Sequence, residues 1–164
     1  LYVRKGVRLR PMFFGGGQQR DMRPGTENVP GWTAFGQACR DHSGRAAENE
    51  RAFFALRAYA LAQIGALAPR AVAHLPEQGA GHIISLSLPG IRSQVLMNFL
   101  ESRGVYVSSG SACSRGKRSH VLTAMGLSPG MIDSAIRVSF GFETKNEDID
   151  ALCQGLKDAC DRLL

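Results

Sequence analysis

Spacings typical of metal sites and disulfide frameworks are missing from this sequence. Its 164 residues include four cysteines, none of them in a C-x-x-C pair, and four histidines, none with metal-ligand spacing. Structural zinc sites and disulfide scaffolds depend on such spacings, so we predict neither. Cys153 and Cys160 lie seven residues apart on a helical pattern and share one face, which indicates core residues. Cysteines used in this way fit a reducing compartment, and we expect a cytoplasmic protein.

Long apolar runs are missing as well. No stretch approaches the roughly 20 apolar residues of a membrane helix, and the strand-like start does not resemble a signal peptide, so no membrane role is expected. The formal net charge of +6 favours acidic partners. However, the basic residues are scattered except at residues 4–10 and 115–118, and no aromatic pattern interleaves them. Direct, sequence-specific nucleic-acid binding is therefore not expected.

Cys113 lies in a short polar segment, Val-Ser-Ser-Gly-Ser-Ala-Cys-Ser-Arg-Gly, at residues 107–116. Segments rich in serine and glycine form exposed loops, and this one gives the thiol little apolar cover. Basic residues follow at once (Arg115, Lys117 and Arg118), and positive neighbours favour the nucleophilic thiolate. The residues alone leave two interpretations open, a reactive nucleophile or a surface thiol with no task.

Helical and strand-like patterns alternate along the chain and predict an α/β fold, arranged as an α+β sandwich. Strands or extended segments are predicted at residues 1–4, 7–14, 71–74, 82–88, 105–107 and 135–140. Helices are predicted at residues 26–40, 44–67, 94–102, 120–124, 128–133 and 146–163. The residues expected to cap helices at their N-termini are Thr26, Ser93, Ser119 and Asn146.

Six short motifs occur in a fixed order along the chain. The cysteine segment contains Ser-Ser-Gly-Ser-Ala-Cys-Ser, followed by Ser-His-Val-Leu at 119–122 and Ala-Met-Gly at 124–126. Before it come Leu-Tyr-Val-Arg at 1–4 and the stretch from Gly-Gly-Gly-Gln-Gln-Arg to Arg-Pro-Gly-Thr-Glu-Asn at 15–28, and after it comes Ile-Arg-Val-Ser-Phe-Gly at 136–141. This ordered set resembles the NifS/IscS class (group I) of cysteine desulfurases.

The resemblance implies the small C-terminal domain of a fold-type I transferase that depends on pyridoxal phosphate (PLP). Residues 31–164 would form that domain, and residues 1–30 a remnant of the large PLP-binding domain. Such enzymes convert L-cysteine to L-alanine and transfer the sulfur to an enzyme cysteine as a persulfide. The implied partners are L-cysteine, a second copy of the full-length enzyme in a homodimer, and a sulfur-acceptor protein, either an iron–sulfur scaffold or a tRNA-thiolation enzyme.

Three residues match functional positions of the resembled class. Cys113 matches the catalytic nucleophile. Arg137 matches the arginine that holds the substrate carboxylate, a role that suits the two parallel hydrogen bonds of a guanidinium. Thr26 matches a residue that reaches the cofactor phosphate of the neighbouring subunit, although Asp21 stands nearby where glycine is common and Pro24 where serine is common. Without the resemblance, Arg137 reads as half of an ion pair with an acid such as Glu143, and Thr26 as a helix cap.

The cofactor lysine of the resembled class lies in a Ser/Cys-His-Lys motif shortly before Leu-Tyr-Val-Arg. None of the four lysines here follows a histidine. We therefore expect the C-terminal part of a longer enzyme, inactive by itself because it lacks the Schiff-base lysine. One alternative is a free-standing sulfur carrier that uses Cys113 without PLP. Another is the small domain of an aminotransferase, against which the cysteine segment argues, since transamination needs no thiol.

Overall fold

The computed structural model describes residues 1–76, 78–109 and 118–164. Cys113 and its immediate neighbours lie outside the described residues. The chain divides into two compact units, Leu1–Arg45 and Ala46–Leu164.

The Leu1–Arg45 unit contains a single helix, α1 (Val29–Ser43), preceded by an irregular segment. The helix begins at Val29 because Asn28 caps it: the side-chain oxygen of Asn28 accepts a hydrogen bond from the backbone N–H of Gly31 at 3.0 Å. The prediction that Thr26 caps this helix was therefore wrong by two residues. Pro30 occupies the first turn, where its missing N–H costs no intrahelical bond.

Residues 1–28 form no strand, so the extended segments predicted at 1–4 and 7–14 are not strands in this structure. A strand is stabilised by ladder hydrogen bonds to a neighbouring strand, and this unit contains none. The turn at Gly6 is present, since Val7 N–H donates to the Arg4 carbonyl at 3.1 Å. Large apolar side chains along this stretch are exposed: Tyr2, Met12, Phe13 and Phe14.

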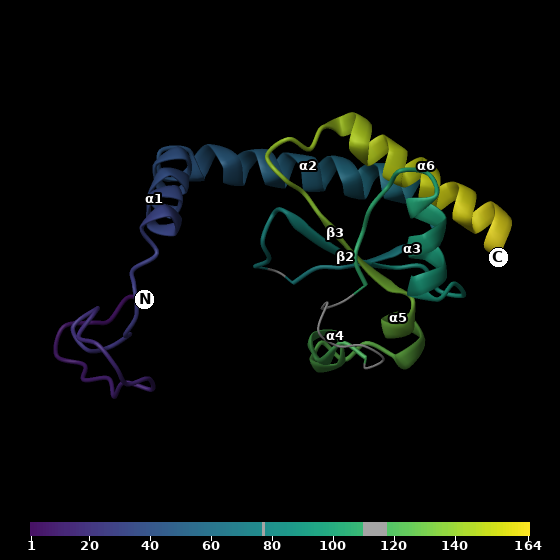
Figure 1. Cartoon of the computed structure of the whole chain (residues 1–164). Helices are drawn as coiled ribbons and strands as arrows, with labels where there is room; N and C mark the ends of the chain where they lie inside the picture. Colours follow the sequence, from purple (N-terminus) through teal and green to yellow (C-terminus); the bar gives the residue numbers. More distant parts are fainter. Residues whose placement is uncertain (77, 110–117) are drawn as a thin grey trace. The chain divides into compact units, whose positions relative to one another are not determined.

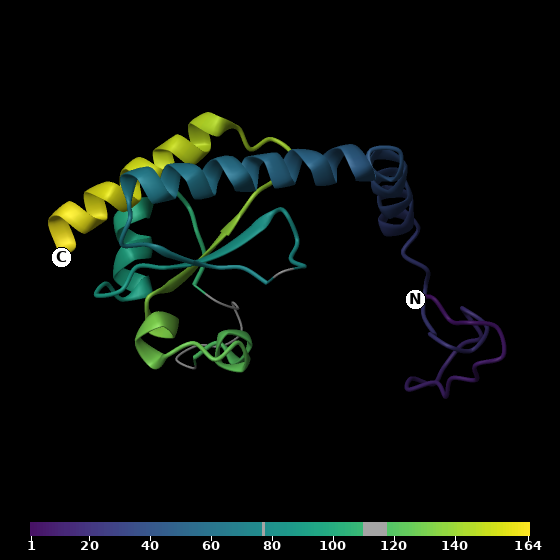
Figure 2. The same ribbon diagram turned by 180° about the vertical axis from the view of Figure 1, so that it is seen from behind.

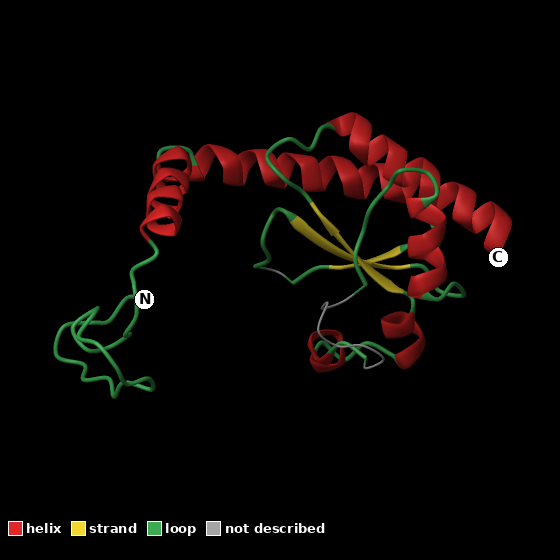
Figure 3. Cartoon of the chain, viewed as in Figure 1, coloured by secondary structure: helices red, strands yellow, loops and turns green. Residues whose placement is uncertain are grey.

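The Ala46–Leu164 unit is built on a three-stranded antiparallel sheet (Figures 1 and 3). The strands lie in the order β1 (Val72–His74), β2 (Ile83–Ser87) and β3 (Ala135–Ser139). One side of the sheet is covered by three helices, α2 (Ala46–Leu67), α3 (Ser93–Glu101) and α6 (Asn146–Leu163). The two short helices α4 (His120–Ala124) and α5 (Pro129–Asp133) lie on the other side, as both views show (Figures 1 and 2).

The main core lies between the sheet and the three long helices. Alternate residues of the two longer strands point into it, Ile84 and Leu86 from β2 and Ile136 and Val138 from β3. From the helices come Ala60, Ile64, Leu96, Leu100, Ile149, Leu152, Cys153, Leu156 and Ala159. The core position predicted for Cys153 is confirmed, whereas Cys160 is only partly buried at its edge.

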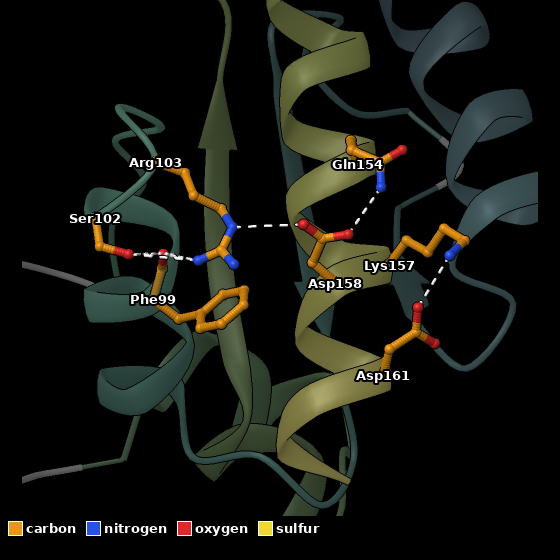
Figure 4. A network of polar contacts seen from close by, with 7 residues as sticks. All are labelled: Phe99, Ser102, Arg103, Gln154, Lys157, Asp158 and Asp161. Atoms are coloured by element: carbon orange, nitrogen blue, oxygen red, sulfur yellow. Dashed lines mark hydrogen bonds and ion pairs between the residues drawn. The ribbon is translucent and has the colours of Figure 1, made fainter.

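Helices α3 and α6 are joined by a polar clip at the rim of the core (Figure 4). The Arg103 guanidinium, which follows α3, stacks over the Phe99 ring at 3.7 Å and lies 3.5 Å from the Asp158 carboxylate on α6. Gln154 donates a hydrogen bond to the same carboxylate at 2.8 Å. One turn away, Lys157 and Asp161 form an ion pair within α6 at 2.9 Å. The Arg103 and Asp158 side chains are still about a quarter exposed (27% and 28%), so the main contribution of the clip is to fix how the two helices meet.

Most predicted elements of this unit are present, with shifted ends. The strands predicted at 71–74, 82–88 and 135–140 are confirmed, each slightly shorter than expected. The strand predicted at 105–107 was wrong; of the described residues 105–109, only Ser108 pairs with the sheet, in an isolated bridge.

The Ser119 cap is confirmed by a 3.4 Å hydrogen bond from Leu122 N–H. Ser93 and Asn146 are instead the first residues of α3 and α6, one position after the caps. The mixed α/β class is confirmed, with a small antiparallel sheet.

Within the described part of the chain, no helix combines the length and the apolar character that crossing a bilayer requires.

Candidate functional site

Four polar residues form a row across the sheet face opposite the main core. His74 on β1 pairs with Ser85 on β2, and Ser85 pairs with Arg137 on β3. Ser108 then pairs with Arg137 from the far side, through an isolated antiparallel bridge. Residues directly opposite one another in an antiparallel ladder point to the same face. The register therefore brings together side chains that are up to 63 positions apart in sequence (137 − 74).

The backbone fixes Arg137 from both sides. Its N–H donates to the Ser108 carbonyl at 2.6 Å, and the N–H of Ser108 donates to the Arg137 carbonyl at 3.1 Å. On the other side, Ile136 and Val138 pair with β2. Ser108 is the fifth residue before Cys113 along the chain. The bridge thus ties the start of the cysteine-bearing segment to the strand that carries Arg137.

A pocket of about 350 Å³ opens over three residues of this row, His74, Ser85 and Arg137. Its floor is the sheet face, with Ile83, Ser85 and Arg137, and one wall is α4. The wall residues are Ser119, His120, Val121, Leu122 and Met125. Apolar side chains dominate the lining, and Arg137, which is exposed, contributes a positive charge at its edge. A largely apolar pocket with a few fixed polar groups is the usual form of a small-molecule site.

His74 is held in this pocket by a buried serine. The Ser87 hydroxyl is fully buried and donates to the Met131 carbonyl at 2.7 Å. Since that bond uses its only hydrogen, the His74 Nε2 at 2.8 Å must carry the hydrogen and donate to Ser87 Oγ. Burial lowers the pKa of His74 below its ordinary value, so the neutral ring with hydrogen on Nε2 is favoured.

Thr26 lies in the other unit, Leu1–Arg45, in an exposed loop before α1. Its carbonyl accepts a hydrogen bond from the Arg23 guanidinium at 3.0 Å. Nearby, Asp21 has a φ of 62°, in the left-handed region, and is the last of three consecutive residues there, after Gln19 and Arg20. Glycine adopts this conformation at no steric cost, whereas other residues pay for it. The left-handed backbone at Asp21 is therefore a physical reason why glycine is common at this position in the resembled class.

The sequence profile of the aminotransferase class-V family matches residues 1–152 of this chain. The chain belongs to that family. Over 99% of its length it is 38% identical to the putative cysteine desulfurase IscS 1 of Bacillus subtilis and 32% identical to the cysteine desulfurase IscS of Methanosarcina thermophila. These alignments cover 44% and 41% of the two relatives, so the chain spans less than half of their length.

Solved structures agree with this assignment. A NifS-like protein superimposes with a TM-score of 0.85 at 32% identity, over 98% of this chain and 41% of the other. A NifS-like protein from Rickettsia africae superimposes with a TM-score of 0.83 at 26% identity, over 94% of this chain and 41% of the other. The resemblance to NifS/IscS-like cysteine desulfurases inferred from the motifs is therefore confirmed.

Class-V aminotransferases use PLP, and a protein holds this cofactor covalently through a lysine side chain. Lys5 lies exposed in the Leu1–Arg45 unit, and Lys145 and Lys157 lie at the start and within α6. None of these three lysines lines the pocket beside Arg137. The described residues therefore do not provide a covalent anchor for PLP at this pocket. In the same residues, no group of three His, Cys, Asp or Glu side chains is arranged to hold a metal ion.

Three residues of the polar row, His74, Ser85 and Ser108, were not singled out by the sequence as site residues. Ser108 was recognised only as part of the cysteine motif, and His74 only as an isolated histidine. The available signal is alternation, which puts Val72 and His74 on one face of β1. The register that aligns this face with Arg137 depends on tertiary packing.

Proposed function

We propose that this chain is part of a NifS/IscS-type cysteine desulfurase, in which Arg137 binds the carboxylate of L-cysteine and Cys113 receives its sulfur. Membership in the class-V family and the match to cysteine desulfurases support this function. The structural observation that best supports this function is the Ser108–Arg137 bridge. It links the strand of the carboxylate-binding residue to the segment that leads to the nucleophile.

The two residues have complementary roles in this proposal. The Arg137 guanidinium, at the edge of the pocket, orients the substrate by donating two parallel hydrogen bonds to its carboxylate. The Cys113 thiolate attacks the substrate sulfur, so that a sulfur–sulfur bond forms as the carbon–sulfur bond breaks. L-Cysteine and the enzyme thiol are thereby converted to L-alanine and an enzyme persulfide, with all atoms accounted for. The cofactor belongs, in this proposal, to a part of the enzyme that the present chain does not span.

The wider assignments are part of the same proposal. Residues 1–30 would belong to the large PLP-binding domain and residues 31–164 to the small domain. In a homodimer, Thr26 would contact the cofactor phosphate of the neighbouring subunit through its hydroxyl, which can donate a hydrogen bond to a phosphate oxygen. The persulfide would pass, in the cytoplasm, to an iron–sulfur scaffold or a tRNA-thiolation enzyme.

Mass spectrometry of the complete enzyme after incubation with L-cysteine tests the proposal. We expect one extra sulfur atom on the peptide that contains Cys113, and none after Cys113→Ser, with PLP still bound in the variant. Extra sulfur on Cys39, Cys153 or Cys160 instead would contradict the assignment. The 164-residue chain alone should release no alanine.

The same experiment separates this function from a free-standing sulfur carrier. A carrier would acquire sulfur on Cys113 in the 164-residue chain only when a separate desulfurase is added. Polypeptides that include this chain and extend beyond it would then release no alanine either. Alanine production by a longer polypeptide that includes this chain would show that the protein is the desulfurase and not a sulfur carrier.

A further inference from the structure

Arg118 and Asp133 form a two-pronged ion pair on the α4–α5 side of the sheet. Arg118 Nε donates to Asp133 Oδ1 and Nη2 donates to Oδ2, both at 2.8 Å. The hydrogen bond and the charge of each partner stabilise the ionised form of the other. The pKa of Arg118 is accordingly raised and that of Asp133 lowered from their ordinary values. Both side chains are about half-exposed, so desolvation opposes the pair only weakly.

Asp133 stands on a rigid support. It is the last residue of α5, and the next residue, Ser134, is buried and donates to the Met131 carbonyl at 3.1 Å. The same carbonyl accepts the bond from Ser87, and Leu88 N–H donates to the Ser134 carbonyl at 3.4 Å. The end of α5 is thus fastened to β2, and β3 follows directly toward Arg137.

Helix α4 is held differently. Arg118 precedes it, Ser119 caps it, and its one buried residue, Leu122, packs in a small cluster with Ile132 and Ala135. This cluster is separate from the main core. A five-residue helix is too short to be stable by itself, so its position depends on its anchors. The Arg118–Asp133 pair is the polar anchor at its first turn.

We propose that Arg118 and Asp133 are positioning residues that hold α4 as the wall of the pocket over Arg137. The ion pair fixes the start of α4 to the rigid end of α5, and α4 together with its two caps, Ser119 and Met125, contributes five residues to the pocket lining. The pair thereby sets the width of the site in which, under the proposed function, Arg137 binds the substrate carboxylate. The ion pair therefore affects substrate binding and not the rate of the chemical step.

Among the described residues, Arg92 also lowers the pKa of Asp133, although it acts less strongly than Arg118. It leaves Asp133 with a nearby positive charge when Arg118 is removed. The Asp133 side chain is about half-exposed, so loss of the Arg118 side chain frees α4 and leaves the carboxylate solvated by water. Of the two residues of the pair, Arg118 is therefore the better one to replace with alanine.

The first test uses the 164-residue chain and does not depend on any activity. Hydrogen exchange is measured at the Thr123 and Met125 amides, which bond to the Ser119 and Val121 carbonyls inside α4. We expect faster exchange in Arg118→Ala, an intermediate effect in Arg118→Lys, and recovery when Arg118→Asp is combined with Asp133→Arg. Lys157→Ala, which removes the exposed pair with Asp161 on α6, is the matched control and should leave α4 unchanged.

The second test is the KM for L-cysteine in the complete enzyme. Arg118→Ala should raise KM roughly two- to fivefold at unchanged kcat, the size expected from a half-exposed pair, and the charge-swapped double variant should restore it. Unchanged exchange in α4, an equal effect from Lys157→Ala, or no recovery in the double variant would overturn the proposal. If instead Arg137→Ala leaves KM unaffected, the proposed role of Arg137 fails, while the exchange measurement still decides whether the pair positions α4.

Discussion

Ser108 and Arg137 exchange two backbone hydrogen bonds, at 3.1 and 2.6 Å, across an isolated antiparallel bridge. Among the described residues 105–109, Ser108 is the one that pairs with the sheet, and the others have no strand structure. It continues the row from His74 through Ser85 to Arg137 by one more residue. The cysteine-bearing segment therefore starts from a fixed point on the sheet.

Replacing Ser108 with proline should destabilise the chain. Proline removes the N–H that donates to the Arg137 carbonyl and restricts the preceding Val107, so one hydrogen bond is lost at a position next to the sheet. We expect the free energy of unfolding to fall by about 1 kcal/mol or more. Urea denaturation of the 164-residue chain measures it. Ser108→Ala keeps both backbone bonds and should be close to wild type; equal losses in the two variants would mean that the bridge is not responsible.

Arg137→Lys in the complete enzyme should weaken substrate binding. Lysine keeps the charge but loses the fork that matches a carboxylate, and hydrogen bonds to charged groups are worth roughly 1.5 to 3 kcal/mol each. The expected result is a raised KM for L-cysteine, measured by alanine release. Arg162→Lys, in the last turn of α6, is the control. A variant with the KM and the kcat of wild type would remove Arg137 from the site.

The sheet of the Ala46–Leu164 unit was predictable because its strands carry their own signals. Ile84 and Leu86 alternate with polar residues, and Pro89 with Gly90 ends the strand. The register was not predictable. The alignment of His74 with Ser85 and Arg137 arises from packing between elements that are distant in sequence, and a slip of one residue would turn each side chain to the other face.

Helix caps and the first 28 residues show where local patterns are insufficient. Thr26 and Asn28 are both good caps, and the choice between them depends on which side chain reaches a free N–H, as Asn28 does toward Gly31. The alternation at residues 1–14 is typical of strands, but strand structure also needs a partner, which the Leu1–Arg45 unit does not supply. The cysteine motif identified Cys113, yet only the structure shows that Ser108 bonds to Arg137.

The cysteines of the described residues should react with iodoacetamide in a fixed order. Cys39 is exposed, Cys160 is partly buried, and Cys153 is fully buried. Burial, helped by Asp150, raises the pKa of the Cys153 thiol from 9.0 to about 11, so it carries almost no thiolate at neutral pH. We expect alkylation of Cys39 first and Cys153 last, followed by mass spectrometry of peptides. Labelling of Cys153 as fast as Cys39 under native conditions would contradict the buried position.

The raised pKa of Cys153 also links stability to alkaline pH. A thiol that ionises less readily in the folded state stabilises the fold fully below its ordinary pKa of 9.0, and that contribution is lost as the pH rises toward about 11. The loss should approach about 2 to 3 kcal/mol for a shift of this size. Cys153→Ala lacks the titration and should show a flatter dependence between pH 8 and about 11, measured by urea denaturation. An identical slope in both proteins would show that Cys153 does not cause it.

His74 should make the stability of the chain fall at mildly acidic pH. Burial holds the pKa of His74 below the ordinary value of 6.5, so the unfolded chain binds the proton more tightly than the folded chain. The stability contributed by the neutral ring is therefore complete above about pH 6.5 and declines as the pH falls through that value toward the lowered pKa. His74→Gln keeps a donor for Ser87 Oγ and cannot titrate, so its midpoint of thermal unfolding should change less between pH 8 and about 5 than that of wild type. His42→Gln, on α1 in the other unit, is the matched control and should retain the wild-type dependence. If His74→Gln and wild type lose the same stability over this range, the proton binds elsewhere, and the Ser87 bond does not hold His74 in its neutral form.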